Sequence, residues 1–519
     1  MNLLKDPWIP VRADGGTGAF CLLTYQQLLC ESGDWQVSLP RDDLELACVQ
    51  LLVCMTQVMF MPEDDKTLRT RMSETLSPDD FAAGISPCCD WFDLDHPTQP
   101  FMQSRGVKAV ENTPIQKLLI GLPEGNNHAF FNEAGEVRNL SGSLAAITLF
   151  NQASNCPSFG GGFKGSLRGG APITTLVYGA NLREMVWRNV LTRPRIAKRQ
   201  IAMLGFEYDQ PTWVKPIQEK ATLPWNEIGL MRGLFWQPAQ VELIKSEVLA
   251  PCDVLGEQAV PVYIGFRKEK FDFTVEGLWP HPHGVMLMKL KNGVLEQKFA
   301  SFTTTSPAWT LLSEFVVPKN INAPNANAGS IPAGPATQAN ELNVEGVYLL
   351  IGGYCAKQAS VVERRHELFS LAQNQDIDGQ KNRLSSLISI GLDARDVLLD
   401  AVFTTAFGQN GMKGIGLVRK KKGRKAIRFR NDAHGYHESA EKLYYARTEN
   451  LIHETFSNEL RFNEWAVARS AFAKQLTEHC RDIFEELTDP YAMKPELIPV
   501  IAWARRSMNI DLAKLMEEA

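Results

Sequence analysis

The sequence predicts an α+β protein: a mixed N-terminal domain with short sheets and helices, followed by a C-terminal four-helix bundle. Two observations lead to this prediction. Up to about residue 315, short β-type runs, turn residues and a few helical segments are mixed, whereas after residue 360 apolar residues recur every three to four positions. We therefore expect a mixed domain at residues 1–359 and a helix bundle at residues 360–519, since the chain is long enough for two or more domains.

The N-terminal domain contains both kinds of regular element. Runs rich in β-branched and aromatic residues, bounded by turn residues, predict strands at residues 173–178, 271–275 and 285–290. Apolar spacing predicts helices at residues 44–59, 114–120, 143–153 and 181–191. The most apolar of these segments carries Glu45, Gln50 and Gln57, so we expect a buried helix there rather than a membrane span.

A change of composition precedes the helical region. Residues 318–340 are rich in Asn, Ala, Pro and Gly, which is typical of a surface loop. Beyond it we expect four amphipathic helices, including one near residues 437–456. The apolar residues at helical spacing include Leu384, Leu387, Ile388, Leu398, Val402, Trp465, Phe472, Leu476, Ile483, Ile501, Met508 and Leu512.

The composition limits the functional classes. The chain has 54 Lys and Arg against 59 Asp and Glu, a formal net charge of −5, so any nucleic-acid contact must come from local basic patches. The ten cysteines are scattered without a CxxC motif. Asp6, Arg12 and Asp14 interrupt the N-terminus, which argues against a signal peptide. We expect a cytoplasmic protein with reduced thiols and no membrane anchor.

The segment FGGGFKGSLRGG at residues 159–170 is the most informative in the chain. Gly160, Gly161 and Gly162 leave main-chain N–H groups open to close approach, and Lys164 and Arg168 add positive charge. The flanking phenylalanines can anchor such a loop in a core. A GxGxxG pattern is present, but no strand precedes it and no helix follows, so a dinucleotide site is not supported. The segment suits a phosphate, a nucleotide or a nucleic-acid groove; a plain solvent turn is the equal alternative.

A second candidate is the basic segment GFRKEKF at residues 265–271. Its two aromatic residues can hold the strand while cations such as Lys268 and Lys270 reach toward phosphates. The alternative is a solvated basic strand edge, which would discourage pairing with other chains. Lys289 and Lys291 alternate on what we expect to be a neighbouring strand and could extend the same face.

Two further segments suggest polyanion binding. Residues 413–430 form a dense basic run without an acidic residue, for which a nucleic-acid strand is favoured over a solvated loop. Residues 352–360, GGYCAKQAS, predict a tight turn whose Lys357 and Gln358 could press a polar amide into stacked bases, but from this segment alone an ordinary polar hairpin tip is favoured. The cations proposed to bind DNA in the basic run are Arg419, Lys420, Lys421, Lys422, Arg424 and Lys425.

One segment raises the rival possibility of an enzyme. His281 and His283 in the sequence WPHPH could share a metal, although Pro282 stiffens the pair and no nearby Cys, Asp or Glu pattern adds ligands. A rigid turn with hydrogen-bonded imidazoles is favoured. The chain also has no G-x-S-x-G nucleophile elbow. We therefore expect a protein that is not an enzyme, with no metal and no cofactor.

Taken together, these segments resemble the large subunit of Cascade, the type I-E CRISPR surveillance complex (the CasA family). The resemblance runs nearly from end to end and keeps its motifs in one order. Besides the glycine segment, the motifs are NLL at 2–4, WIPV at 8–11, SLPRDD at 38–43, FNQ at 150–152, GLFWQPA at 233–239, GLWPHPH at 277–283 and ERRH at 363–366. Only Cys252 remains where a relative has a small cysteine cluster, so the resemblance implies no structural zinc here.

The resemblance implies a non-catalytic subunit that recognises the PAM in double-stranded target DNA, starts strand separation and provides a platform for a helicase-nuclease. Carried over by position, Gly161 and a lysine finger at Lys270 would enter the PAM minor groove, and Gln358 would be the wedge that parts the first base pairs. Phe130 and Asn132 would contact the guide RNA and other Cascade subunits. The basic run at 419–430 resembles an insertion between bundle helices, and we expect it to grip displaced or target-strand DNA.

Overall fold

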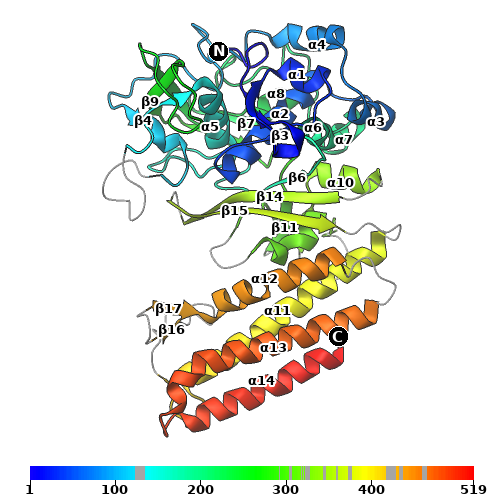
Figure 1. Ribbon diagram of the computed structural model, residues 1–519, viewed down its shortest axis with the longest axis vertical. Helices are drawn as coiled ribbons and strands as arrows, with labels where there is room; N and C mark the ends of the chain where they lie inside the picture. Colours follow the sequence, from blue (N-terminus) through cyan, green and yellow to red (C-terminus); the bar gives the residue numbers. More distant parts are fainter. Residues whose placement is uncertain are drawn as a thin grey trace. The chain divides into compact units, whose positions relative to one another are not determined.

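Figure 1 shows the computed structural model of the chain. It describes residues 1–122, 135–291, 293–302, 307–316, 318–319, 321, 328–342, 347–357, 360–371, 377–415, 428–431, 436–458 and 465–518. The chain forms two compact units. The first comprises Met1–Thr304, Glu314–Val344 and Tyr348–Leu368, and the second comprises Thr305–Ser313, Glu345–Val347 and Phe369–Ala519. Short sheets and helices build the first unit and long helices dominate the second, which confirms the predicted α+β class.

Short, mostly antiparallel sheets run through the described part of the first unit. One sheet has the order β2–β1–β3, from β1 (Ile9–Arg12), β2 (Phe20–Leu23) and β3 (Gln36–Val37). In another, β9 (Val262–Glu269) pairs with β4 (Thr113–Pro114), β5 (Leu140–Ser141) and β8 (Gln240–Lys245). Two more have the orders β15–β14–β6 and β12–β11–β13, from β6 (Thr174–Val177), β11 (Met286–Lys291), β12 (Val294–Phe299), β13 (Ala328–Ile331), β14 (Val347–Lys357) and β15 (Ser360–Leu371). A parallel pair joins β7 (Ala221–Pro224) to β10 (Phe273–Glu276).

Helix α2 (Asp42–Met59) forms the centre of the first core, because nearly all of its residues are buried. A helix that is apolar on all sides belongs inside a protein, as predicted for residues 44–59. It packs against α5 (Gly142–Ser154) and α6 (Leu182–Asn189). The surrounding helices are α1 (Tyr25–Cys30), α3 (Asp65–Ser73), α4 (Pro78–Ile85), α7 (Arg193–Lys198), α8 (Leu230–Leu234) and α10 (Gly334–Glu341). Among the described residues, no helix combines the length and the apolar character needed to cross a bilayer.

Most predicted elements of this unit are confirmed. Strands β6, β10 and β11 occupy the predicted runs, and α5 and α6 the predicted helices. The surface loop predicted at 318–340 is wrong in part, because β13 and α10 lie within it and bury Ser330, Ala336 and Ala339. The predicted helix at 114–120 is wrong. Pro114 is extended and ends β4, and only the short 3₁₀ helix η3 (Ile115–Leu118) follows before Gly121, which has a φ of 88°.

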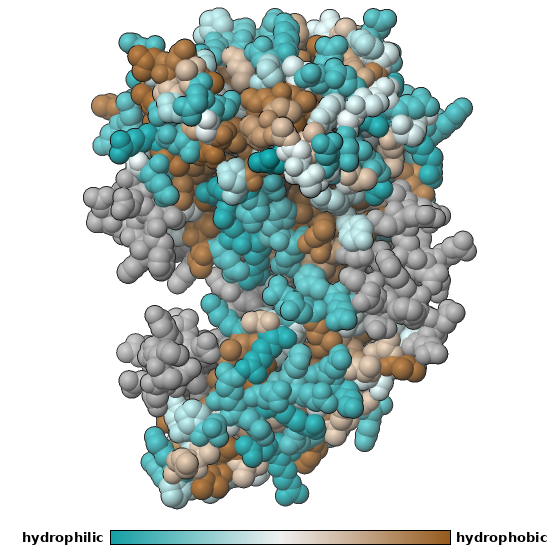
Figure 2. All heavy atoms as spheres, in the orientation of Figure 1, coloured by the Kyte–Doolittle hydropathy of each residue, from teal (hydrophilic) through white to brown (hydrophobic). Residues whose placement is uncertain are grey.

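The described part of the second unit contains four long helices: α11 (Ile377–Phe407), α12 (Ala440–Asn458), α13 (Trp465–Ala492) and α14 (Ile498–Glu518). Helix α11 packs against the other three, and α13 also contacts α12 and α14, which makes a bundle (Figure 1). Buried residues at the predicted spacing fill it, including Leu387, Leu398, Val402, Leu476, Ile483 and Leu512. On the face that Figure 2 shows, hydrophilic side chains cover most of this unit, as expected for amphipathic helices.

Two boundaries differ from the predicted ones. Helix α12 begins at Ala440 rather than near residue 437, because β17 (Tyr436–Ser439) pairs there with β16 (Arg428–Asn431). The boundary expected after residue 359 falls between the neighbouring strands β14 and β15, and the main segment of the second unit begins at Phe369.

Candidate nucleic-acid interface

The glycine loop, residues 159–170, begins shortly after the end of α5. Gly160, Gly161 and Gly162 have φ angles of 80°, 54° and 89°, in the left-handed region that favours glycine. The Phe163 amide donates to the Gly160 carbonyl at 2.9 Å and closes the turn. Gly161 and Gly162 are exposed, and a Cβ atom on Gly161 would meet no atom within 4 Å. The turn therefore presents uncovered backbone to solvent.

Aromatic packing anchors this turn. The rings of Phe159 and Phe163 lie 5.5 Å apart in an edge-to-face arrangement, and Phe159 lies 5.8 Å from the buried ring of Phe266 on β9. The Lys268 ammonium lies 5.0 Å from the centre of the Phe159 ring, within cation–π range. Lys268 thus covers the aromatic anchor of the loop and brings positive charge to its side.

Lys270 lies directly beside the exposed glycines. It follows the end of β9, is exposed, and its Nζ donates to the Gly161 carbonyl at 3.3 Å. The two residues are 109 positions apart in sequence. The alternative of a basic strand edge stays open: Phe266 of β9 pairs with Thr113 on one side and with Leu243 on the other, whereas residues 267–269 pair in register with β8 on one side. The fold therefore brings together the bare turn and a long cationic side chain.

The two cations within the glycine loop have different surroundings. Lys164 is partly exposed and its Nζ lies 3.0 Å from Asp272 Oδ1. Arg168, which we expected beside the exposed backbone, is only 4% exposed and points into the core. Its Nη2 donates to Asn155 Oδ1 at 2.6 Å and to the Ser154 carbonyl at 3.0 Å. That expectation is therefore wrong, because the Arg168 guanidinium turns inward and donates through Nη1 and Nη2 to neutral buried acceptors.

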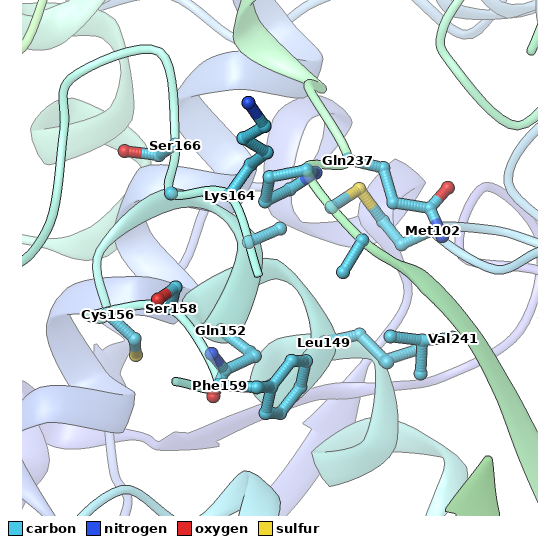
Figure 3. Close-up of a pocket in the computed structure, with 14 residues that line it drawn as sticks. Met102, Leu149, Gln152, Cys156, Ser158, Phe159, Lys164, Ser166, Gln237 and Val241 are labelled. Atoms are coloured by element: carbon cyan, nitrogen blue, oxygen red, sulfur yellow. The ribbon is translucent and has the colours of Figure 1, made fainter. Parts of the chain in front are cut away.

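A pocket lies under the loop (Figure 3). Phe159, Lys164 and Ser166 of the loop line one side together with the preceding Ser158, and Met102, Gln237 and Val241 line the other. Leu149 and Gln152 come from α5. The lining is mainly apolar, so the pocket itself offers few groups for an anion.

Lys289 and Lys291 do not extend the β9 surface as expected. They are exposed on β11, which pairs with β12 and β13 in a sheet that does not contain β9. Lys291 Nζ lies 3.2 Å from Glu296 Oε1 across the β11–β12 pair. Their expected position on a neighbouring strand is therefore wrong, although both remain available to solvent.

Several predicted site residues fall wholly or partly outside the description. Gly352 and Gly353, expected in a turn, lie within strand β14, where a Cβ atom would collide with Leu46 or with the Pro172 carbonyl. The backbone of Lys357 ends β14. The residues outside the described part of the chain are Phe130, Asn132, Gln358, Arg419, Lys420, Lys421, Lys422, Arg424 and Lys425.

His281 and His283 are buried and paired with each other. The His283 amide donates to His281 Nδ1 at 3.1 Å, and the Gln50 amide nitrogen lies 3.4 Å from His283 Nδ1. Burial and nearby positive charge lower the pKa of His283 to about 3 and the pKa of His281 well below its usual range. The described residues contain no cluster of three or more His, Cys, Asp or Glu side chains that could hold a metal ion. The geometry supports a hydrogen-bonded turn.

Sequence reasoning did not assign a role to the buried polar groups behind the loop. Asn151, Asn155 and Tyr354 are each 3% exposed or less and are hydrogen-bonded to one another. The available signal was the pair of asparagines near the end of an otherwise apolar helix, since a buried amide requires partners. The partner Tyr354 lies 203 positions from Asn151 in sequence, so the pattern alone could not identify it.

Comparisons with known proteins agree over nearly the whole chain. A family model described as CRISPR-associated protein Cse1 matches residues 2–483. The chain is similar to Cse1 of Thermobifida fusca, with 17% identity, coverage of 100% of this chain and 98% of that chain, and a TM-score of 0.72. It is also similar to CasA (Cse1) of Thermus thermophilus, with 16% identity, 99% coverage of both chains and a TM-score of 0.70. It is also similar to a chain of a solved CRISPR RNA-guided surveillance complex, with 14% identity, coverage of 98% of this chain and 99% of that chain, and a TM-score of 0.66.

Proposed function

Because the chain belongs to the Cse1 (CasA) family of Cascade large subunits, we propose that it recognises the PAM beside a DNA target and starts strand separation there. In this proposal it acts without catalysis, in the cytoplasm, and provides a platform that recruits a helicase-nuclease. Its partners are the guide RNA, double-stranded target DNA and the other Cascade subunits, with Phe130 and Asn132 assigned to the guide RNA and subunit contact.

The contact between Lys270 and Gly161 carries this proposal. A turn of three glycines can enter a narrow groove because no side chain holds it back, and the ammonium beside it is attracted to acceptors there. The minor groove offers degenerate acceptors and a single guanine amino donor. A backbone carbonyl and one lysine can use both kinds of group, so this reader should accept several PAM sequences.

The other proposed contacts act on the flanking DNA. Gln358 would insert as a wedge at the first base pairs, with Lys357 beside it on a phosphate. Opening a duplex costs about 1–2 kcal/mol per base-pair step, so a wedge needs only to bias the first steps before guide pairing compensates. Lys268, Lys289, Lys291 and the cations at 419–425 would add sequence-independent phosphate contacts.

The test is DNA binding by the reconstituted complex containing Lys270→Ala or Gly161→Ala. On a target duplex with a functional PAM, we expect each change to weaken binding about tenfold, because a specific groove contact contributes about 1–3 kcal/mol. The preference for PAM over non-PAM duplex should fall as well. Binding is measured by titration against labelled duplexes.

Gly169→Ala is the matched control. Gly169 also has a positive φ, 84°, and space for a Cβ atom, so it carries the same backbone cost within the same loop. We expect this variant to bind like the wild type. If Lys270→Ala and Gly161→Ala also bind normally and keep the PAM preference, the chain is a scaffold and the proposed function is wrong.

A further inference from the structure

The second half of the glycine loop is held by the buried Arg168 side chain. Its Nη1 donates to Thr174 Oγ1 on β6 at 3.0 Å, and its Nη2 donates to Asn155 Oδ1 at 2.6 Å. Thr174 Oγ1 in turn donates to Asn155 Oδ1 at 3.1 Å. Within the described residues, all acceptors of Arg168 are neutral, and burial lowers the pKa of its guanidinium to about 9. The charge persists at neutral pH and is therefore expensive to bury.

From Asn155 the hydrogen bonds continue through the end of α5 to strand β14. Asn155 Nδ2 donates to Asn151 Oδ1 at 3.0 Å, one helical turn earlier. Asn151 Nδ2 donates to the Tyr354 hydroxyl at 2.7 Å. Tyr354 is 1% exposed and lies three residues before Lys357, where β14 ends.

The row of hydrogen bonds ends at the Asp43 carboxylate, which binds side chains of both β14 and β15. The Tyr354 hydroxyl donates to Asp43 Oδ2 at 2.8 Å, and Arg364 of β15 donates to Asp43 Oδ1 at 3.0 Å. Arg41 adds two bonds to the same carboxylate, at 2.9 and 2.7 Å. Burial alone would raise the pKa of Asp43, but these bonds and the charges of Arg41 and Arg364 outweigh it and lower that pKa. The carboxylate is therefore ionised and holds strands on either side of the Gln358 segment.

Stability alone does not account for this row of polar groups. Well-packed apolar residues of similar volume are often at least as stabilising as buried ionic groups. What a hydrogen-bonded row adds is direction, because each amide, hydroxyl and guanidinium accepts only a narrow range of partner positions. The row runs from Arg168 through Asn155, Asn151 and Tyr354 to Asp43, so it fixes the glycine loop relative to the two strands.

We infer that Arg168, Thr174, Asn155, Asn151 and Tyr354 are positioning residues that couple PAM reading by the glycine loop to strand opening at the β14–β15 end. The inference rests on the function proposed above. The groups touch no DNA in this scheme; they hold the glycine loop at a fixed spacing from β14 and β15, so that binding of a PAM at Gly161 acts on the two strands that flank the proposed wedge in sequence.

The central test is Tyr354→Phe in the reconstituted complex. The change removes the hydroxyl that joins Asn151 to Asp43 and keeps the ring. Opening rates are measured on a fully paired target and on one whose first base pairs beside the PAM are mismatched. We expect the paired target to open at least about fivefold more slowly, because the variant loses both directional hydrogen bonds of the Tyr354 hydroxyl, and the mismatched target to open at the wild-type rate.

Two variants accompany it. Tyr348→Phe changes an exposed tyrosine on the same strand and should leave both rates unchanged. Thr174→Val removes the hydroxyl that bonds to both Arg168 and Asn155 but keeps their direct hydrogen bond, so it should slow opening of the paired target less than Tyr354→Phe does. Slowing at this second site would show that the effect of Tyr354→Phe does not come from a folding defect at Tyr354 alone.

A double-mutant cycle with Gln358→Ala separates positioning from general destabilisation. If the row places the wedge, Gln358→Ala should slow opening less in the Tyr354→Phe background than in the wild type. Equal slowing on both targets, full additivity, or no slowing at all would overturn the coupling. If Lys270→Ala and Gly161→Ala abolish PAM preference while Tyr354→Phe behaves as wild type, the coupling alone fails and the proposed function stands.

Discussion

At the scale of single residues, burial determines the chemistry of His281 and His283. Both side chains are enclosed, and desolvation, with the positive charge of Arg168 and Arg199, disfavours a second proton on either ring. The sequence favoured a hydrogen-bonded turn over a metal site for this pair. The structure supports such a turn, in which the Gln50 amide of α2 lies beside His283 Nδ1, a contact that prolines and spacing could not indicate.

A pH dependence follows for His283. The unfolded chain takes up a proton below its ordinary pKa of about 6.5, whereas the folded chain does so only near 3, so stability falls as the pH drops between these values. His283→Gln should reduce the slope of unfolding free energy against pH by about 1.4 kcal/mol per unit in that window. Urea unfolding at a series of pH values measures the slope.

His96→Gln is the control. His96 is partly exposed, and its Nδ1 accepts hydrogen bonds from the backbone amides of Thr98 and Gln99. We expect a slope close to that of the wild type. An unchanged slope in His283→Gln would show that His283 titrates normally in the folded protein.

The glycine loop shows how far single residues can be interpreted from the sequence. Its three glycines and two phenylalanines occur together, and their roles in turn and anchor follow from local chemistry. Arg168 could not be placed in the same way. A long side chain reaches partners beyond its own segment, and Thr174 and Asn155 become its partners only after α5 and β6 have packed.

At the scale of elements, the locally encoded ones were predictable. Helices α2, α5 and α6 were found from apolar spacing, because each buries a continuous face or all of its surface. The surroundings of β9 could not be predicted, because its pairing with β4, β5 and β8 depends on residues far away in the chain. Gly352 and Gly353 were misplaced for the same reason: they permit close packing in β14 against Leu46 and the Pro172 carbonyl.

The basic run is an element whose role can be tested by salt. Replacing Arg419, Lys420, Lys421, Lys422, Arg424 and Lys425 with Ser should weaken target binding and make it less sensitive to salt. Each lost phosphate contact reduces the slope of log K against log salt by about 0.9, so the full set can reduce it by about five. Affinities of the complex measured at several salt concentrations give the slope.

Lys474→Ser is the comparison variant for this series. Lys474 is exposed on α13, and its loss should leave the slope unchanged. If the six-residue replacement also leaves affinity and slope unchanged, the run does not bind DNA.

At the scale of the whole molecule, the division into units is not a single cut in the sequence. The helical unit includes Thr305–Ser313 and Glu345–Val347 in addition to its main segment. Within it, Trp309 is fully buried, 5.9 Å from the ring of Tyr445, and fills the space beside Gly391. Helical periodicity after residue 360 could not reveal a contribution from a short segment some 50 positions earlier.

Trp309→Ala should therefore destabilise the helical unit. Removing a buried tryptophan leaves a cavity that costs about 3–5 kcal/mol. We expect faster amide hydrogen exchange in α11 and α12, with little change in α2, as followed by mass spectrometry on peptides from each unit. Trp465→Ala, at a partly exposed site beside Arg383, should cost about 1 kcal/mol. Equal effects of the two changes would contradict the structural role of Trp309.

In the function proposed above, the Lys270–Gly161 contact also affects how quickly the protein can sample a duplex. A lysine side chain gives up about 2 kcal/mol of rotamer entropy when it is immobilised. Because the Lys270 ammonium already rests on the Gly161 carbonyl at 3.3 Å, part of this ordering takes place during folding rather than at the encounter with DNA. A preorganised side chain needs little rearrangement at each new site, which favours brief, repeated trials along DNA over slow adjustment at any one of them.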